Sequence, residues 1–387
     1  MNKKGIIPFI GAWIILTLAC CNKNNHSNGL ANNSSPADNA YLSISFKKIL
    51  EIHEDWFDYG SLFIDSEGNL IYWQERDGIV SKFDAEGKKL LSKKFQAGQG
   101  YGDLNFFDFE DGGDRYLVYD KVNMRINHFD KDFNIQKSEQ MRKDDLLSKY
   151  IFRFDERKNR YFVFDEMKAD PSGWNQDVGV ARCEADGKKK TTYFQARYRL
   201  YDFKDGLMIG YFYGQPFLRY IVDPEGALWI CDRREYKIYK YDSSGRIEKT
   251  IEKVYERIPL RGETEKKFRS YYRLDRLENQ KNREITPAYA NPIMDFILLE
   301  KHILVLTMEN QWKSNRKGMI AADVFDREGR YLQKLEIPEF YACYSLNNQF
   351  KSAICYKNGR LAALESDEDM EKFKISQYQL QYIETNE

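Results

Sequence analysis

The chain contains 387 residues, and its 60 lysines and arginines are balanced by 60 aspartates and glutamates, so the formal net charge at pH 7 is zero. A chain without a basic excess lacks the bulk charge that nucleic-acid surfaces use, so we expect no nucleic-acid partner. Aromatic residues make up 15% of the chain, and this much large apolar surface excludes a chain that is disordered throughout. The length suggests two or three domains, unless the chain is an array of like units.

The first 21 residues predict a signal peptide. Lys3-Lys4 precedes an apolar run over residues 5–19, which is shorter than the roughly 20 residues that a membrane span needs. A basic start, a short apolar stretch and a small-residue exit are typical of a secretory signal. Leu18-Ala19-Cys20-Cys21 resembles the lipobox of bacterial lipoproteins. We therefore predict Cys21, or alternatively Cys20, as the lipidated residue; the other interpretation is a cleaved signal whose cysteines are accidental.

Residues 22–39 predict a flexible tether, because they are rich in Asn, Ser, Ala and Gly and show no apolar periodicity. Such a linker spans roughly 25 Å root-mean-square. In lipoproteins of the Bacteroidota type, acidic residues just after the lipidated cysteine tend to signal export to the outer face, and Asn22-Lys23-Asn24-Asn25 lacks them. The sequence therefore favours an outer-membrane lipoprotein of the cell envelope that faces the periplasm. Its membrane contact is the N-terminal lipid.

From residue 40 onward, apolar runs alternate with two kinds of short turn. An aspartate early in the turn and a glycine late in it suit a tight hairpin, because glycine accepts positive φ. The first kind, D-x-x-G, occurs at 65–68 and 223–226, with a degenerate copy at 155–160. The second kind, an aromatic residue followed by D-x-x-G, occurs at 83–87, 241–245 and 325–329, with weaker copies at 129–134 and 184–187.

The acidic residue of the second turn recurs at positions 84, 130, 184, 242 and 326, with spacings of 46, 54, 58 and 84 residues. About four strands per 40–60 residues are typical of a β-propeller blade. We predict an all-β fold over residues 40–387, a six-bladed β-propeller of four-stranded antiparallel blades; seven blades is the alternative. The blades lie near 57–97, 105–140, 150–197, 200–252 and 285–338, and the sixth combines 349–384 with the strand 41–52. A shared blade closes the ring and removes exposed sheet edges.

The turn pairs, the linker Gly98-Gln99-Gly100-Tyr101-Gly102-Asp103 and the lipoprotein start together resemble the six-bladed, NHL-like propeller lipoproteins of Bacteroidota. The resemblance covers residues 40–387 and implies the fold. It implies no activity, because its motifs carry almost no information about function. The chain departs from the usual linker by placing Tyr101 where a proline is common.

A charged insertion near 253–288 separates the fourth and fifth blades. We predict that Thr264 caps one short helix running to about Asn282, because apolar residues recur there every three positions (Phe268, Tyr271, Leu274 and Leu277). Residues 257–284 hold nine basic and five acidic side chains. Such a helix can touch lipid headgroups or an acidic partner. The favoured interpretation is a helix that lies on the propeller with its charged side in solvent.

The topology of a propeller blade predicts where a binding site lies. In a four-stranded meander, the tight first and third turns share one face, and the second loops and the interblade linkers share the other. Aromatic side chains on this long-loop face would contact a sugar or a peptide; the candidates are Trp56, Tyr101, Trp174 and Trp312. Arg153 and Arg219, on predicted innermost strands, could face an anionic ligand in the central channel. The favoured alternative for both arginines is a blade-to-blade ion pair.

Motifs for catalysis are absent from the sequence. There is no G-x-S-x-G elbow, no H-E-x-x-H and no P-loop, and the D-x-x-G turns lack the ligands of a calcium loop. We therefore expect no catalytic residue, no metal and no cofactor. Cys343 and Cys355 are the one pair of propeller cysteines close in sequence, and an oxidising periplasm would permit their pairing. Cys183 and Cys231 are expected to pack as small apolar residues.

The function predicted from these observations is that of a non-enzymatic binding or scaffolding module. Its partner would be a glycan, a peptide or an envelope protein. The alternative is a carbohydrate-active lyase or hydrolase with its site at the channel mouth, because fold alone does not exclude activity. A third hypothesis is a subunit of an outer-membrane assembly.

Overall fold

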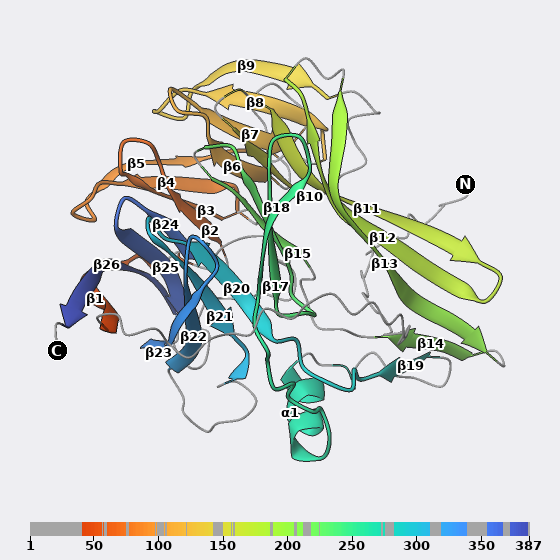
Figure 1. Cartoon of the computed structure of the whole chain (residues 1–387). Helices are drawn as coiled ribbons and strands as arrows, with labels where there is room; N and C mark the ends of the chain where they lie inside the picture. The colour runs from red at the N-terminus through yellow and green to blue at the C-terminus, as the bar shows by residue number, and fades with distance from the viewer. Residues whose placement is uncertain are drawn as a thin grey trace, which may run out of the picture.

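The computed structural model describes residues 41–55, 57, 60–74, 77–96, 98, 104, 107–120, 122–141, 150–155, 157, 159–185, 189–204, 207–211, 218–223, 225–271, 274, 282–309, 319–338, 354–366 and 372–385. The predicted signal peptide and tether lie outside these residues. Within the described ranges, the chain forms six β-sheets and one α-helix. Each sheet contains one four-stranded antiparallel blade (Figure 1). The blades are numbered 1 to 6 in the order in which their first strands occur along the chain. The predicted six-bladed propeller is confirmed.

The first three blades follow one another along the chain. Blade 1 contains β2 (Ser61–Ile64), β3 (Leu70–Gln74), β4 (Ile79–Phe83) and β5 (Lys89–Lys94). Blade 2 contains β6 (Phe107–Asp111), β7 (Tyr116–Asp120), β8 (Arg125–Phe129) and β9 (Ile135–Gln140). Blade 3 contains β10 (Tyr150–Phe154), β11 (Arg160–Asp170), β12 (Gly173–Cys183) and β13 (Lys190–Lys204), and continues into β14 (Leu207–Tyr211) and β19 (Asn282–Ile285).

The other three blades complete the ring. Blade 4 contains β15 (Leu218–Val222), β16 (Leu228–Asp232), β17 (Lys237–Tyr241) and β18 (Ile247–Glu252). Blade 5 contains β20 (Ile293–Leu298), β21 (His302–Thr307), β22 (Met319–Asp326) and β23 (Tyr331–Pro338). Blade 6 contains β24 (Ile354–Lys357), β25 (Arg360–Ser366), β26 (Phe373–Thr385) and, as its outermost strand, β1 (Tyr41–His53). Neighbouring blades meet through their first strands, as β2 does with β24 and β6 with β10.

Blade 3 is larger than the sequence predicted. The predicted start of blade 4 at residue 200 is wrong, because residues 190–204 form one strand of blade 3 and blade 4 begins at Leu218. β11 and β12 have 11 residues each and β13 has 15, so their hydrogen-bonded ladder continues past the body of the propeller. β14 joins β13 antiparallel, and β19 joins β14 parallel. We name residues 166–177, 197–204, 207–211 and 282–285 the blade-3 extension; it projects from the blades in Figure 1.

The predicted short turns are confirmed where the structure describes them in full; the copies at 155–160, 184–187 and 223–226 each include residues outside the described ones. The Asp65 carboxylate accepts hydrogen bonds from the backbone N–H of Glu67 at 2.9 Å and of Asn69 at 2.8 Å, and Gly68 has a φ of +84°. Asp84, Asp130 and Asp242 bond their own turns in the same way. In the weaker copy at 129–134, Phe133 occupies the position of the glycine with a φ of +59°. A turn aspartate therefore satisfies the backbone donors of each hairpin.

β1 closes the ring, as predicted. It pairs antiparallel with β26 from Tyr41 opposite Thr385 to His53 opposite Lys374. Charged side chains reinforce the pairing, because the Glu51 carboxylate accepts bonds from Lys374 Nζ at 2.7 Å and Lys48 Nζ at 2.6 Å. These bonds lower the pKa of Glu51 to about 2.

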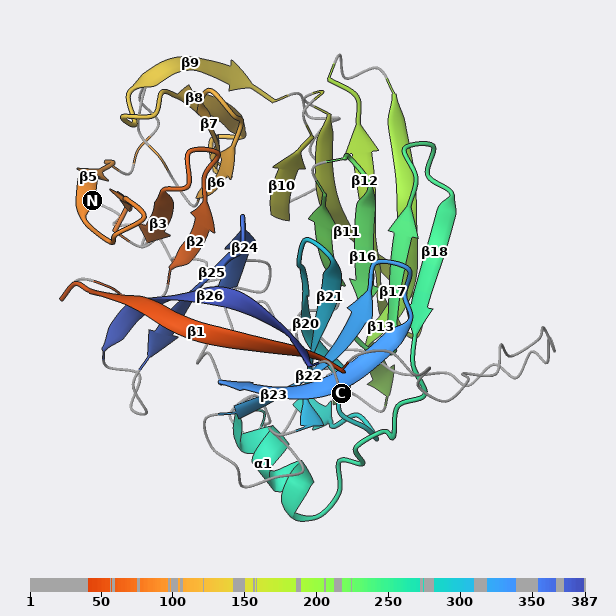
Figure 2. The same cartoon turned by 60° about the vertical axis from the view of Figure 1, so that its left-hand side comes forward.

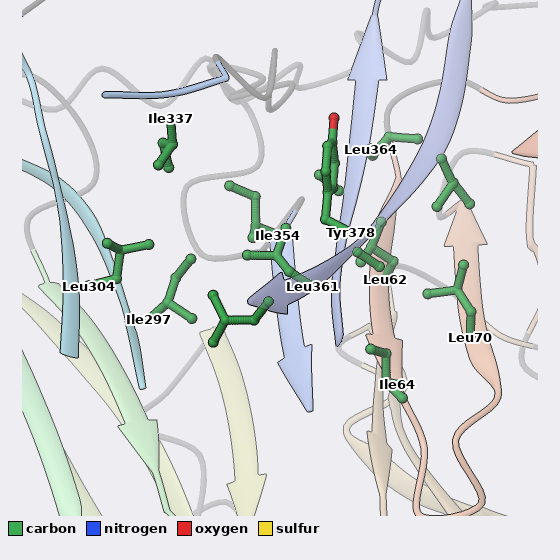
Figure 3. Packing of buried hydrophobic residues seen from close by; sticks show 14 of the residues in the cluster. Leu62, Ile64, Leu70, Ile297, Leu304, Ile337, Ile354, Leu361, Leu364 and Tyr378 are labelled. Atoms are coloured by element: carbon green, nitrogen blue, oxygen red, sulfur yellow. The ribbon is translucent and has the colours of Figure 1, made fainter. Parts of the chain in front are cut away.

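A buried apolar cluster joins the closing blade to its neighbours. Figure 3 shows side chains of blade 6 packed between those of blades 1 and 5, including Ile354, Leu361, Leu364 and Tyr378 of blade 6, Leu62, Ile64 and Leu70 of blade 1, and Ile297, Leu304 and Ile337 of blade 5. Burial of such side chains is the main stabilising contribution to a blade interface. The first and last strands of the described chain thus share one core with blades 1 and 5.

The helix of the insertion is shorter than predicted. α1 spans Glu263–Tyr271, and the residues near Asn282 form strand β19 instead. Thr264 is the second residue of α1 and does not cap it, because the Lys266 N–H bonds the carbonyl of Gly262. Phe268 is buried in the cluster shared by blades 3 and 4, so the favoured interpretation, a helix packed on the propeller, holds (Figure 2). The predicted Leu277 lies outside the described residues.

The closing blade gives a first testable prediction. Ile375 is fully buried between Ile52 of β1 and Leu364 of β25, so Ile375→Ala should lower the free energy of unfolding by about 2–5 kcal/mol. The matched change Ile49→Ala, at a 43% exposed position of the same strand pair, should alter it by less than about 0.5 kcal/mol. Chemical denaturation measures both values. Equal effects of the two variants would show that closure does not depend on this core.

Candidate binding surface on the blade-3 extension

The structure describes three of the six predicted binding residues, which are Arg153, Trp174 and Arg219. Trp56, Tyr101 and Trp312 lie outside the described residues, as do Cys20, Cys21 and Cys343. Their predicted roles in ligand contact and lipidation stay predictions.

Arg153 and Arg219 hold neighbouring blades together. Arg153 Nη1 of β10 lies 2.7 Å from Glu110 Oε2 of β6 in blade 2. Arg219 Nε of β15 lies 2.9 Å from Asp295 Oδ1 of β20 in blade 5. The predicted blade-to-blade ion pair is therefore correct for both residues.

Three described cysteines are free thiols, namely Cys183, Cys231 and Cys355. Cys183 and Cys231 are buried, as predicted for small apolar residues. Burial raises the pKa of Cys231 and of Cys355, which keeps both thiols protonated and poorly nucleophilic. Cys355 forms no disulfide.

Trp174 lies near the tip of the β11–β12 hairpin. The sequence predicted an irregular segment here, but the strands remain paired from Arg160 opposite Cys183 to Asp170 opposite Gly173. Trp174 pairs with Ala169 on β11 and with Tyr201 on β13. Strand pairing on both sides therefore positions this indole, which is 37% exposed, and the register of β12 with β13 shifts between Trp174 and Asn175.

Strands β11 to β13 of the blade-3 extension share one uncharged face. Side chains alternate between the two sides of a sheet, and directly paired residues share a side. This places the buried Gln176 and Tyr198 on one side with five further side chains, which we call the apolar face: Met167, Ala169, Trp174, Tyr201 and Phe203. Twelve large apolar side chains are exposed in the part of the chain that the structure describes, and three of them lie together here: Met167 at 39%, Trp174 at 37% and Phe203 at 51%. Most of the others lie on outer strands of separate blades, so this gathering marks a surface suited to contact.

The opposite side of the same strands, the charged face, is made of ion pairs. It carries four anions and four cations, namely Glu166, Asp170, Asp177, Asp202, Lys168, Arg197, Arg199 and Lys204. The buried Asp177 carboxylate accepts bonds from Arg197 Nε at 2.6 Å and Lys168 Nζ at 2.8 Å. The hydrogen bond from Arg197, followed by that from Lys168, lowers the pKa of Asp177 to about 2.

Arg199 fixes the hairpin tip from behind Trp174. Its guanidinium donates to Asp202 Oδ1 at 2.6 Å, to Ser172 Oγ at 2.6 Å and to the Asp170 carboxylate. Gly173 allows the strands to approach, because a Cβ at this position would lie 1.8 Å from the Tyr201 carbonyl oxygen. Bonds from Ser172, then from Arg199, lower the pKa of Asp170. The tip is thus held in one conformation on its charged side while its apolar face stays open.

The base of the extension is attached to the rest of the propeller. Tyr198 is buried, and the Arg234 guanidinium of blade 4 lies 4.0 Å from the centre of its ring. Leu200 packs in the same cluster as Phe268 of α1 and Leu274. The insertion also supplies β19 to the sheet. Contacts from two other parts of the chain therefore make the extension a rigid projection.

The sequence contained a signal for this surface that the turn pattern concealed. In 166–170, 197–200 and 201–204, charged and uncharged side chains alternate, as in Glu-Met-Lys-Ala-Asp. Alternation with period two indicates a strand with two unlike faces. The tight turns alone define the predicted blades. They place residues 166–170 beside a long loop and residues 200–204 at the start of blade 4.

Comparison with known proteins supports the fold. No protein-family model matches the sequence, and no curated protein matches it. A solved member of the DUF4221 family from Bacteroides vulgatus is similar over 89% of this chain and 100% of its own, with 10% identity and a TM-score of 0.50. An exported protein from Bacteroides fragilis covers 90% and 98%, with 9% identity and a TM-score of 0.47. The predicted likeness to Bacteroidota propellers is thus confirmed at the level of fold.

An enzyme is also among the similar structures. Virginiamycin B lyase from Staphylococcus aureus is similar over 88% of this chain and 100% of its own, with 13% identity and a TM-score of 0.42. A likeness this distant carries no argument about chemistry in this chain.

Among the residues that the structure describes, no three His, Cys, Asp or Glu side chains gather in a way that would hold a metal ion. No helix in these residues is long and apolar enough to cross a membrane.

The role of Arg199 gives a second prediction. Arg199→Gln should release the hairpin tip, because it removes charge-assisted bonds to Asp170 and Asp202. We expect amide hydrogen exchange near Trp174 to become roughly tenfold faster, a loss of about 1.4 kcal/mol of local stability. Lys204→Gln, an exposed change on the same face, is the control and should leave exchange unaltered. An unchanged rate in Arg199→Gln would show that strand pairing alone fixes the tip.

The ionisation of Asp177 gives a third prediction. A carboxylate whose pKa is depressed by folding stabilises the folded state above its ordinary pKa, and this contribution is lost as the pH falls through the folded value. The carbon-13 signal of the Asp177 carboxyl should therefore titrate at about 2. Arg197→Gln should move this midpoint upward, toward the value of an unpaired aspartate. The same midpoint in both proteins would contradict the assigned cause.

Proposed function

We propose that the protein is a lipid-anchored propeller of the cell envelope that binds a partner protein without catalysis. The observation that carries the proposal is the apolar face of the blade-3 extension. Protein interfaces are enriched in Trp, Phe and Met and are poor in charge at their centre, which is the composition of Met167, Trp174 and Phe203. The rigid base of the extension lowers the entropy that binding must overcome.

The chemistry of the apolar face favours a protein over a glycan. Recognition of a sugar ring combines aromatic stacking with hydrogen bonds to its hydroxyl groups. The charged groups of strands β11 to β13 lie on the other side of the sheet, where Asp177 and Asp170 are bonded to Arg197 and Arg199. The thioether of Met167 and the ring of Phe203 offer a hydroxyl group no strong hydrogen bond. An apolar side chain of a protein is the better match.

The alternative of a carbohydrate-active lyase or hydrolase receives less support from the geometry. Such a site would need acidic, basic or electrophilic groups that converge on a substrate. The two arginines considered for an anionic ligand in the central channel, Arg153 and Arg219, form ion pairs with Glu110 and Asp295. The exposed apolar side chains lie instead on a lateral projection, away from these first strands.

The envelope location in this proposal rests on the sequence. The basic start, the apolar run and Cys20-Cys21 together are typical of a bacterial lipoprotein signal. A lipid at Cys21 or Cys20 would leave residues 22–39 as the link between the membrane and the propeller. A partner in the same membrane would then be held near the apolar face, which raises its effective concentration.

Site-specific photo-crosslinking in the protein's own host tests the proposed function. A photoreactive phenylalanine at position 167 or 203 should form a covalent adduct with a protein. The same residue at Val122, which is 60% exposed on blade 2, is the matched control and should form none. Equal crosslinking at all three positions would contradict the proposal.

A thermal-shift screen of the purified protein against oligosaccharides completes the test. A ligand at about 100 times its dissociation constant stabilises a protein by roughly 2.7 kcal/mol, which is a measurable rise in melting temperature. We expect no rise that depends on Trp174. A rise with a sugar that is lost in Trp174→Ala would overturn the choice of a protein partner and assign the face to a glycan.

A further inference from the structure

We infer that the protein binds a small carboxylate at a second site, between blades 3 and 4 on the face that carries the short turns. The site is formed by Arg182 of β12 and Tyr193 of β13, with the partly exposed Glu184 at its solvent side. The apolar face lies at the other end of the same strands, so this inference does not rest on the proposed function.

Arg182 is a buried cation without a close partner. It is one of three buried arginines in the part of the chain that the structure describes, and 8% of its surface is exposed. The other two donate to oxygen atoms: Arg125 Nε lies 3.3 Å from Asp120 Oδ2, and Arg233 Nε lies 3.2 Å from a backbone carbonyl oxygen. Arg182 Nε has no hydrogen-bond partner among the described residues, and its ion pair with Glu184 is 4.0 Å long. Because burying a poorly paired cation is costly, an additional acceptor would stabilise it.

A second buried polar group lies beside the guanidinium. Tyr193 is 7% exposed, and Arg182 Cζ lies 5.9 Å from the centre of its ring. Its hydroxyl also has no hydrogen-bond partner in the described part of the chain. Burial raises the pKa of Tyr193, and the Arg182 cation opposes this rise without cancelling it. The hydroxyl is therefore protonated at neutral pH and can donate a hydrogen bond.

The contact between the two blades holds both donors in place. Arg182 pairs with Tyr161 of β11, and the centre of the Tyr161 ring lies 6.2 Å from that of Tyr193. The Tyr161 hydroxyl donates to the carbonyl of Gly226 in a turn of blade 4 at 3.4 Å. Tyr193 packs edge to face against Tyr241 of blade 4, with the ring centres 5.6 Å apart. Donors that are already ordered lose little entropy when a ligand binds.

The charges around the site favour a ligand with a single negative charge. The planar fork of a guanidinium matches the two oxygens of a carboxylate. Glu184 acts on Arg182, and Asp155 and Asp242 act on Tyr193, so a phosphate dianion would be repelled more strongly than a monocarboxylate. The Glu184 side chain is 38% exposed, and an exposed ion pair contributes little stability. A carboxylate can therefore displace Glu184 from the guanidinium.

Nuclear magnetic resonance of the full-length protein, with nitrogen-15 in its arginines, tests the inference. Sodium acetate should shift the Nε–H signal of Arg182 in a saturable way, with half-saturation at about 1–10 mM. Sodium chloride at the same ionic strength should not shift it. Arg219 Nε, which lies 2.9 Å from Asp295 Oδ1, is the internal control, and its signal should stay constant in both salts.

Two variants should change the affinity for acetate in opposite directions. Tyr193→Phe removes a donor to a charged group and should weaken binding roughly tenfold. Because that hydroxyl has no partner among the described residues, the melting temperature without acetate should not fall. Glu184→Gln removes the competing carboxylate and should strengthen binding about two- to fivefold.

Four results would overturn the inference. The first is an Arg182 signal that stays constant up to about 100 mM acetate, and the second is an equal shift with chloride. The third is an unchanged affinity for acetate in Tyr193→Phe, which would show that the hydroxyl does not contact the ligand. The fourth is a shift with phosphate but none with acetate, because the ligand would then not be a carboxylate.

Discussion

Ring closure is the constraint on which the rest of this structure depends. A propeller blade buries both of its faces against neighbours, so an open ring would leave two blade surfaces in water. The chain solves this by pairing β1 with β26, and the pairing places residues from both ends of the described sequence in one core with the blades beside them. Each interblade ion pair, including Arg153 with Glu110, then acts within a closed circle, where no blade can shift alone.

The fold was predictable because the turn motifs that separate its strands are local in the sequence. An aspartate such as Asp65 or Asp242 satisfies backbone donors within its own turn, and a glycine two or three residues later takes a positive φ, so each hairpin can be read from six residues. The extent of blade 3 was not predictable in this way. β19 reaches β14 from 71 residues away along the chain, and no local pattern shows that a strand will join a distant sheet.

The candidate site was only partly predictable, for the same reason. Trp174 could be singled out because a large aromatic residue stood in a segment without turn motifs. What makes it part of a surface is its register with Ala169 and Tyr201, which depends on the pairing of three strands. Arg153 and Arg219 show the converse case. Their place on first strands was correct, but the carboxylates that engage them come from other blades, which a single sequence does not align.

The position of β1 has a mechanical consequence for a tethered protein. β1 is the first strand after the predicted tether, and it is also the outermost strand of the closing blade. A force applied through the tether would therefore act on the pairing of β1 with β26 before it acted on another blade. A force along β1 would load its backbone hydrogen bonds to β26 together, in shear, whereas a force across it would break them one at a time. The direction in which the tether leaves Tyr41 thus sets how much tension the ring withstands.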